Sequence, residues 1–227
     1  MTNPQATIRK KRLLWYHFGM KTKLFVDFDG TMFDTTGFKE ATLEVFRKAG
    51  FSKDELMTAY QAECLDYKYS ITGMTERLKK VRYFNFSLTQ ARIEKLFRDV
   101  PRYIYDDTEQ FLQSVDKSKY ELILITLGET HFQHKKVENS KLEKYFDQVL
   151  YTEIQKWDYL ENIVQKVERF ILIDDRSDTI HQVSLKFPKA LALQMNRRDE
   201  DRDDPARNGR VYKNLSVRNF RQAASYL

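Results

Sequence analysis

The chain has 227 residues, of which 39 are Lys or Arg and 33 are Asp or Glu, and its formal net charge is +6. Only 7 Gly and 4 Pro are present, which excludes a collagenous or low-complexity chain, and no apolar run approaches the ~18 residues of a membrane span. The single cysteine, Cys64, excludes a disulfide framework and a cysteine zinc cluster, and it favours a cytoplasmic protein. Because no apolar run is long enough for a membrane span, we expect no membrane partner.

Residues 1–20 combine the basic run Arg9–Arg12 with a short apolar stretch that His17 interrupts. Because this stretch is short and no small-residue cleavage site follows it, we interpret residues 1–20 as a basic N-terminal extension rather than a signal peptide. The positive net charge fits either a nucleic acid or a small phosphorylated substrate. The basic run is short and no nucleic-acid-binding module is recognisable, so we expect the small phosphorylated substrate and no nucleic acid.

The first predicted element is a strand over Leu24–Val26, followed by Asp27 and by the turn residues Asp29, Gly30 and Thr31. Asp27 and Asp29 stand two residues apart, and carboxylates so close repel each other unless a cation or a proton intervenes. Carboxylate oxygens in small number suit Mg²⁺, which often bridges protein carboxylates and a substrate phosphate. This segment is therefore the first candidate for a site.

Residues 35–102 contain no convincing strand and form a predicted helical insertion. The predicted helices cover Phe38–Ala49, Lys53–Tyr67, Thr75–Tyr83 and Thr89–Arg98. The aromatic residues of this segment are expected to form its own core; they are Tyr60, Tyr67, Tyr69, Tyr83, Phe84 and Phe86. The insertion is about the size of a small helical bundle.

After the insertion, helical and apolar stretches alternate. Helices are predicted over Thr108–Lys117, His131–Lys144, Trp157–Glu168 and Ser177–Phe187. Strands are predicted over Leu122–Ile125, Gln148–Tyr151, Phe170–Ile173 and Ala190–Leu193. This alternation predicts an α/β fold with a doubly wound, Rossmann-like parallel sheet, formed by residues 21–34 and 103–227. The charged stretch 196–210 is expected to be a solvated surface loop.

Polar residues gather where the predicted strands end: Asp27 and Asp29, then Thr126, Lys156 and the pair Asp174–Asp175. In such sheets ligands bind beyond the carboxyl ends of the strands. A phosphoryl-transfer site uses all of these groups. Asp27 would be the nucleophile, Asp29 would exchange protons with the leaving alcohol and with water, and Lys156 with Mg²⁺ would offset phosphoryl charge. The Thr126 hydroxyl and neighbouring backbone N–H groups would hold phosphoryl oxygens; these neighbours are Gly30, Thr31, Leu127 and Gly128.

The four segments resemble, in order and spacing, the four motifs of the haloacid dehalogenase-like (HAD) hydrolase superfamily. They read LFVDFDGTMFD from Leu24, ELILITLGE around Thr126, TEIQKWDYL around Lys156, and FILIDDRSD around Asp174 and Asp175. The resemblance covers the predicted core from Lys23 to Leu193. It implies that residues 35–102 form a helical cap domain, which closes over the site and selects substrates.

The resemblance implies that Asp27 is both the nucleophile and a Mg²⁺ ligand. It implies that Asp29 is the acid and base and gives its backbone carbonyl to the metal. Asp175 resembles the direct carboxylate ligand, with Asp174 farther from the metal. Asp178 either aids the metal or decorates the first turn of its helix, and both interpretations stay open.

Some positions depart from the family's pattern or compete for its roles. Leu127 stands where a small polar residue is more usual, which leaves a side-chain contact to phosphate there in doubt. Lys135 and Lys136 compete with Lys156 for the role of the lysine, and we favour Lys156 because it follows a predicted strand and opens a helix. His131 and His134 are interpreted as surface residues of a helix.

Asp29 also separates the chemistries within the superfamily. The resemblance implies that dehalogenases lack this second Asp, so a phosphomonoester hydrolase acting on a small organic phosphate through an aspartyl-phosphate is the leading hypothesis. A phosphomutase or phosphotransferase with the same site, and a binding or regulatory protein that retains the site, are the alternatives. The sequence does not indicate the substrate or the oligomeric state.

Overall fold

The computed structural model describes residues 21–64, 69–164, 168–197 and 214–227. The predicted N-terminal extension and all but the first two residues of the predicted charged loop lie outside these ranges. None of the helices within the described ranges combines the length and the apolar character that crossing a membrane requires.

The core is a six-stranded parallel sheet in the order β3-β2-β1-β4-β5-β6. The strands are β1 (Thr22–Val26), β2 (Tyr120–Leu127), β3 (Gln148–Thr152), β4 (Phe170–Asp174), β5 (Leu191–Met195) and β6 (Ser216–Val217). β1 lies in the middle of the sheet; β2 and β3 follow on one side of it, and β4, β5 and β6 on the other. This topology confirms the predicted doubly wound, Rossmann-like fold.

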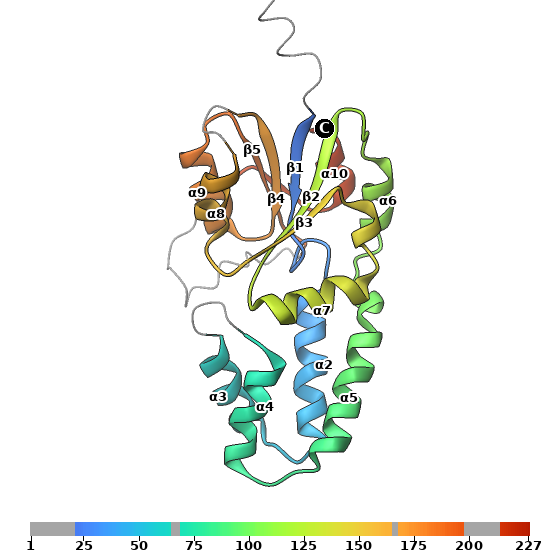
Figure 1. Cartoon of the computed structure of the whole chain (residues 1–227), viewed down its shortest axis with the longest axis vertical. Coiled ribbons are helices and arrows are strands. Elements are labelled where there is room, and N and C mark those ends of the chain that lie inside the picture. The colour runs from blue at the N-terminus through green and yellow to red at the C-terminus, as the bar shows by residue number, and fades with distance from the viewer. Residues whose placement is uncertain (1–20, 65–68, 165–167, 198–213) are drawn as a thin grey trace, which may run out of the picture.

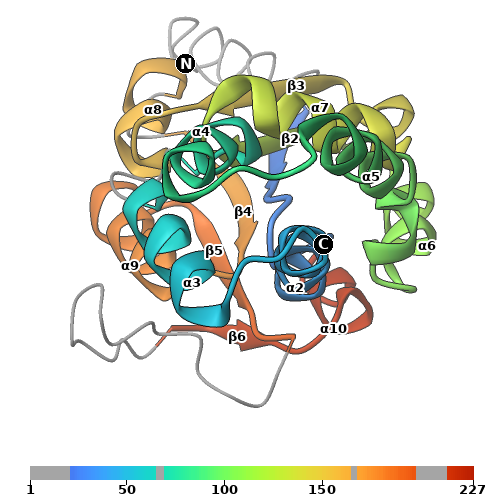
Figure 2. The same cartoon turned by 90° about the horizontal axis from the view of Figure 1, so that it is seen from below.

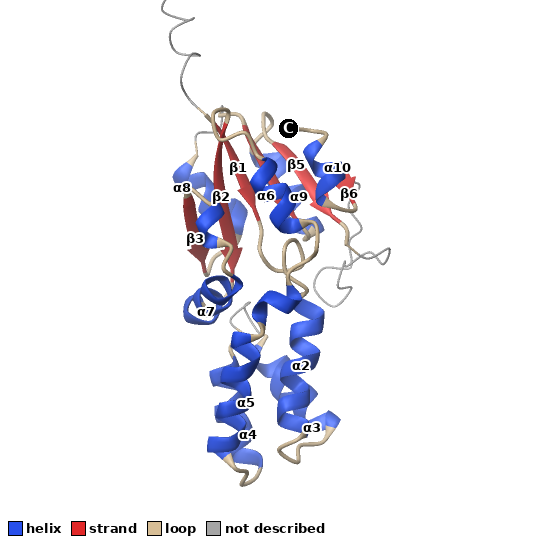
Figure 3. Cartoon of the chain, turned by 90° about the vertical axis from the view of Figure 1, so that its right-hand side faces the viewer, coloured by secondary structure: helices blue, strands red, loops and turns tan. Residues whose placement is uncertain are grey.

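Helices cover both faces of the sheet (Figures 1 and 3). One apolar core lies under α8 (Lys156–Ile163) and α9 (Ser177–Lys186), where Phe25, Leu172 and Ile180 are fully enclosed. The other core lies under α6 (Thr108–Ser114), α7 (Thr130–Ser140) and α10 (Phe220–Ala224). Because the central strands are buried on both faces, they are continuous apolar runs, which is why the sequence reveals them.

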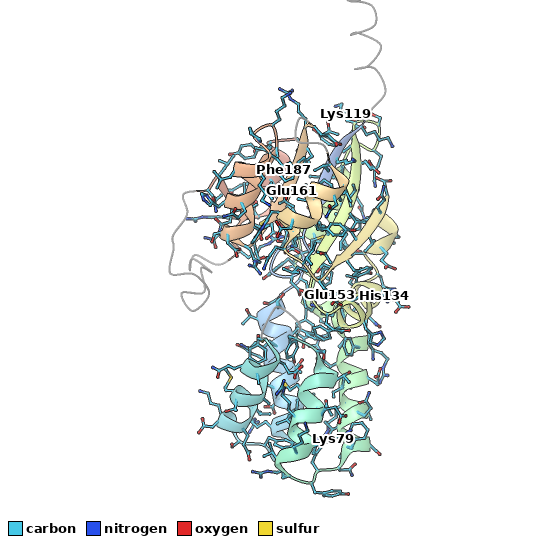
Figure 4. The ribbon with its side chains drawn as sticks, turned by 60° about the vertical axis from the view of Figure 1, so that its left-hand side comes forward. Lys79, Lys119, His134, Glu153, Glu161 and Phe187 are labelled. Atoms are coloured by element: carbon cyan, nitrogen blue, oxygen red, sulfur yellow. The ribbon has the colours of Figure 1, made fainter. Side chains whose placement is uncertain are left out.

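Of the described helices that lie between β1 and β2 in the sequence, four lie beyond the carboxyl ends of the strands in space (Figures 1 and 2). They are α2 (Thr35–Arg47), α3 (Lys53–Glu63), α4 (Ile71–Val81) and α5 (Phe86–Arg98). Figure 4 shows the same polarity: Lys119, just before β2, lies at the far end of the sheet, whereas Glu153, just after β3, lies at the junction with these helices. We call α2–α5 the helical insertion.

The chain enters and leaves the helical insertion at one place. Phe33 and Ile104 form an antiparallel bridge, and the backbone N–H of Asp34 donates to the carbonyl of Tyr103 at 2.7 Å. A short 3₁₀ helix, η2 (Val100–Tyr103), precedes the return crossing. The two crossings are therefore hydrogen-bonded neighbours next to the segment that carries Asp27 and Asp29.

The observed helices of the insertion begin earlier than predicted, except for α3. Each begins after a residue whose side chain accepts from the first turn: Asp34, Ser52, Ser70 and Asn85. These caps, and not the first apolar residue, set the starting points. The expectation about aromatic residues was wrong in two places: Phe84 is buried, but Tyr83 is 96% and Phe86 42% exposed. Tyr67 lies outside the described residues.

Other element boundaries also differ from the prediction. α6, α7 and α8 end before the predicted Lys117, Lys144 and Glu168. In α7 the cause is Lys141, which adopts a left-handed conformation with φ 62° and ends the helix before a second 3₁₀ turn, η3 (Glu143–Tyr145). β5 extends two residues beyond the predicted strand, and the two-residue β6 was not predicted.

Candidate active site

The ends of β1 and β4 bring together the two predicted acidic segments. Val26 pairs with Ile173 in parallel register, and the backbone N–H of Asp27 donates to the carbonyl of Ile173 at 2.9 Å. Asp27 thus lies beside Asp174, the last residue of β4. Both side chains are almost fully buried.

Asp27 opens a tight turn that the backbone of Gly30 makes possible. Gly30 has φ 76°, and the N–H groups of Met32 and Phe33 both donate to the carbonyl of Phe28. A residue with a Cβ would be strained at this φ. The turn brings the hydroxyl of Thr31 to 3.5 Å from the carboxylate of Asp27.

Lys156 lies at the centre of the acidic cluster. Its Nζ is 2.5 Å from Oδ1 of Asp27 and 2.6 Å from Oδ2 of Asp174, and the residue is 1% exposed. Burial alone would lower the pKa of this ammonium, but the carboxylates of Asp174 and Asp27 raise it above its ordinary value. Lys156 therefore remains charged in the buried cluster.

Asp175 joins the two carboxylates that contact Lys156. Asp27, Asp174 and Asp175 offer oxygen atoms that all lie within 4.8 Å of one another. Burial, together with the charges of Asp174 and Asp175, raises the pKa of Asp27 well above its ordinary value, although Lys156 opposes the shift. This donor set of carboxylate oxygens fits a divalent cation such as Mg²⁺.

Asp29 points away from this cluster, toward α7. Its two carboxylate oxygens lie 2.6 and 2.7 Å from Nζ of Lys136, and they accept further hydrogen bonds from Thr35 (2.9 Å) and Gln133 (2.8 Å). Burial would raise the pKa of Asp29, but Lys136 and these hydrogen bonds together hold it below its ordinary value. In this arrangement Asp29 is a carboxylate.

The three lysines that competed for one role lie in three different places. Lys156 contacts Asp27, whereas Lys136 contacts Asp29 and lies 4.8 Å from the ring centroid of Phe132. Lys135 pairs with Glu94 on α5 of the helical insertion. Only Lys156 reaches the carboxylate proposed as the nucleophile.

Thr126 is fully buried near the end of β2, and the loop after it is shaped around Gln133. The hydroxyl of Thr126 lies 3.2 Å from Oε1 of Gln133, and Nε2 of Gln133 donates to the carbonyl of Leu127 at 3.1 Å. Gly128 has φ 154°, and a Cβ at this position would lie 2.5 Å from Nε2 of Gln133. Gly128 therefore leaves room for Gln133.

The carbonyl of Thr31 accepts two hydrogen bonds from Arg197, at 3.0 and 2.8 Å. The guanidinium also forms a bidentate pair with Asp107 at 2.8 and 2.9 Å. Its side chain is only 7% exposed. Arg197 thus ties the segment after β5 to the turn that follows Asp27.

Sequence reasoning missed Gln133 and Arg197, and it considered Lys136 only for the role of Lys156. Gln133 and Lys136 share the buried face of α7 with Phe132 and Val137, at helical spacings of three and four residues. Polar residues on the apolar face of a predicted helix were the available signal. No comparable signal marks Arg197, whose partners are far away in the sequence.

The remaining candidates lie outside the cluster. His131 and His134 are exposed on α7, as expected, and His134 lies at the outer surface of the junction in Figure 4. Asp178 pairs with the guanidinium of Arg176 and does not belong to the three-carboxylate cluster. A cavity of about 100 Å³ between α4, α5 and α7 is lined by none of the predicted catalytic residues.

Comparison with known proteins connects this geometry to a family. Residues 24–166, more than half of the chain, match the family model described as haloacid dehalogenase-like hydrolase. No curated protein matches the sequence significantly.

Solved structures share the fold at low sequence identity. A haloacid dehalogenase-like hydrolase from Burkholderia xenovorans superposes with a TM-score of 0.70 at 14% identity, covering 91% of this chain and 96% of its own. The HAD-hydrolase YfnB from Bacillus subtilis, bound to magnesium, has a TM-score of 0.61 at 16% identity, with 91% and 98% covered. An L-2-haloacid dehalogenase from Xanthobacter autotrophicus, with chloropropionic acid covalently bound, has a TM-score of 0.58 at 12% identity, with 91% and 98% covered.

Proposed function

Because this chain belongs to the haloacid dehalogenase-like hydrolases, we propose that it is a Mg²⁺-dependent phosphomonoester hydrolase. Its substrate is a small phosphorylated metabolite, and its intermediate is an aspartyl-phosphate on Asp27. The helical insertion is its cap domain and selects the substrate. The lone cysteine, Cys64, forms no disulfide, which fits the cytoplasmic location that we propose.

The observation that carries the proposal is the Lys156 ammonium, which contacts Asp27 and Asp174 within a cluster of three carboxylates. A nucleophilic carboxylate must come close to a phosphoryl group that is itself negatively charged. The ammonium of Lys156 offsets that repulsion. Asp27, Asp175 and Asp174 are the residues that would hold Mg²⁺, with the backbone carbonyl of Asp29. When bound, Mg²⁺ would neutralise further charge on the phosphoryl oxygens.

The first step forms a bond between a carboxylate oxygen of Asp27 and phosphorus. The bond from phosphorus to the leaving oxygen breaks, its electron pair stays on that oxygen, and Asp29 supplies the proton. Asp29 must be protonated for this step, and the negative charge of the arriving phosphoryl group favours that form.

In the second step Asp29 accepts a proton from water, the water oxygen attacks phosphorus, and the bond to Asp27 breaks. The carboxylate of Asp29, surrounded by donors in the structure, is the form that this step requires. The Thr126 hydroxyl donates a hydrogen bond to a phosphoryl oxygen in both steps. The backbone N–H groups of Thr31 and Leu127 would provide the other donors. Those of Gly30 and Gly128, also expected from the sequence to hold phosphate, already donate to the carbonyls of Phe33 and Thr152 at 2.8 and 3.0 Å.

Dehalogenation is the competing activity, because relatives of the same fold include haloacid dehalogenases. Asp29 favours the phosphatase, since displacement of halide from carbon needs no proton donor, whereas release of an alcohol does. The deciding experiment offers the purified protein 4-nitrophenyl phosphate with and without Mg²⁺, and 2-chloropropionate in parallel. Phosphate release that needs Mg²⁺ and disappears in Asp27→Asn supports the proposal, with Asp158→Asn as the matched control. Chloride release without phosphate release contradicts it.

A further inference from the structure

The side-chain amide of Gln133 has a fixed orientation. Its Nε2 faces Oδ2 of Asp29 at 2.8 Å and the carbonyl of Leu127 at 3.1 Å. A backbone carbonyl only accepts hydrogen bonds, and the carboxylate of Asp29 does the same while it is paired with Lys136. The NH₂ group must therefore face these two acceptors, which leaves the amide oxygen facing Thr126.

This orientation fixes the direction of the hydrogen bond to Thr126. Oε1 of Gln133 can only accept, so the Thr126 hydroxyl, 3.2 Å away, donates its single proton to it. Both residues are buried, at 0% and 5% exposure, so water does not readily replace either partner. At rest, the proton of Thr126 points at Gln133.

The loop after β2 preserves this arrangement. At Gly128 a Cβ would lie 2.5, 3.1 and 3.2 Å from Nε2, Cγ and Cδ of Gln133. The absence of a side chain at Gly128 therefore keeps the Gln133 amide beside Thr126. The loop backbone thus holds the Gln133 side chain in two ways: Leu127 accepts a hydrogen bond from it, and Gly128 leaves the space that it occupies.

We propose that Gln133 is a positioning residue that competes with the phosphoryl group for the hydroxyl proton of Thr126 and thereby sets the affinity for phosphate. This inference rests on the proposed function, in which Thr126 donates to a phosphoryl oxygen. An unprotonated phosphoryl oxygen also only accepts, and the Thr126 hydroxyl has one proton. When phosphate binds, Thr126 rotates, and the buried Oε1 of Gln133 loses its donor. Phosphate binding is weakened by this exchange, which favours release of the inorganic phosphate product.

The test measures the inhibition constant of inorganic phosphate against 4-nitrophenyl phosphate in a Mg²⁺ buffer. Gln133→Met removes the competing acceptor, so phosphate should bind about two- to tenfold more tightly, the range of one hydrogen bond. Turnover should fall at the same time, because Asp29 loses one of its donors. The same substitution in a Thr126→Val background should give no gain in phosphate affinity, since that hydroxyl is absent.

Gln113→Met is the matched control, because Gln113 donates to Tyr145 on the exposed side of α6. This control variant should leave both the inhibition constant of phosphate and the turnover rate unchanged. Gln133→Leu provides a second apolar variant if the first does not fold. A purely structural role for Gln133 would weaken phosphate binding or leave it unaltered.

The possible outcomes separate this inference from the function on which it rests. A wild-type protein that neither binds phosphate nor releases it from an ester contradicts the proposed function and this inference with it. A wild-type protein that does both, with no tighter binding in either Gln133 variant, contradicts the role of Gln133 alone. Failure of both variants to fold would make Gln133 a structural residue and would also overturn the inference.

Discussion

The ammonium of Lys136 lies 2.6 and 2.7 Å from the two carboxylate oxygens of Asp29, and the Lys136 side chain is 3% exposed. A lysine buried so deeply is stable only when it is paired, and Asp29 is its ion-pair partner. The pair joins α7 to the segment that follows β1. We therefore expect the ion pair to stabilise the folded protein as well as to orient Asp29 in the candidate site.

Lys136→Met should lower the free energy of unfolding by about 3 kcal/mol at pH 7, because it leaves the Asp29 carboxylate without its cation. We take the lower end of the usual range because the Asp29 side chain retains 23% exposure. Urea denaturation measures the loss. Lys135→Met is the control: its pair with Glu94 is partly exposed, so the change should be about 1 kcal/mol or less.

The loss in Lys136→Met should also depend on pH. The Asp29 pKa is lower in the folded protein than in the unfolded chain, where it is about 3.9. Such a group stabilises the fold above its unfolded pKa, and this contribution is lost as the pH falls through its folded pKa. The wild type and Lys136→Met should therefore differ most above about pH 5 and converge in stronger acid. A difference that stays constant with pH would contradict the ion pair.

Asp27→Asn should abolish turnover yet raise the free energy of unfolding by on the order of 1 kcal/mol at pH 7 in EDTA. The folded pKa of Asp27 is raised, so the wild type loses stability as the pH rises from the unfolded value toward the folded one. Asp27→Asn has no carboxyl group at this position to ionise, so it does not lose this stability as the pH rises. Lys156 still pairs with Asp174 in the variant. Thermal melts across this pH range measure the effect, and a destabilised Asp27→Asn would contradict it.

Mg²⁺ should raise the melting temperature, since a cation that binds only the folded chain stabilises it by about 2.7 kcal/mol at one hundred times its Kd. Asp175→Asn removes one of the three clustered carboxylates and should reduce or abolish the shift. Asp158→Asn, which removes an exposed carboxylate that pairs with Lys186, should retain it. An equal shift in both variants would place the cation elsewhere.

Arg197→Met should lower the free energy of unfolding by about 3 kcal/mol, because it removes two hydrogen bonds to Thr31 and the charge partner of Asp107. Arg47→Met removes an exposed pair with Glu44 and should change stability by no more than about 0.5 kcal/mol. Equilibrium unfolding in urea compares the two. If Arg197→Met and Arg47→Met both lowered the free energy of unfolding only slightly, the hydrogen bonds from Arg197 to Thr31 would contribute little to stability.

The sheet could be predicted because burial on both faces leaves a direct trace in the sequence. Leu122–Ile125 and Phe170–Ile173 are apolar at every position, as buried parallel strands require. β6, with two residues and one buried side chain, leaves no such trace. It exists because β5 offers it a hydrogen-bonding edge, and the sequence does not display that edge.

The candidate site could be predicted in part, for a related reason. Asp27 and Asp174 follow strands that are visible in the sequence, and parallel strands end at one edge of the sheet. The partners of Asp29 could not be found in this way. Gln133 and Lys136 come from the side of a helix, and their meeting with Asp29 depends on how α7 packs, which no local pattern encodes.

The crossing at Asp34 and Tyr103 has a consequence for how such a chain can diversify. The outgoing and returning segments of the chain are hydrogen-bonded to each other there, so the two ends of the helical insertion are held together at the edge of the core. We expect that residues 36–102 can be exchanged for a segment of another length or shape without altering the order of the strands, whereas Thr35 must stay because it donates to Asp29. Grafting a foreign module onto this junction should give a folded chimera that keeps the same carboxylates and meets a different molecule.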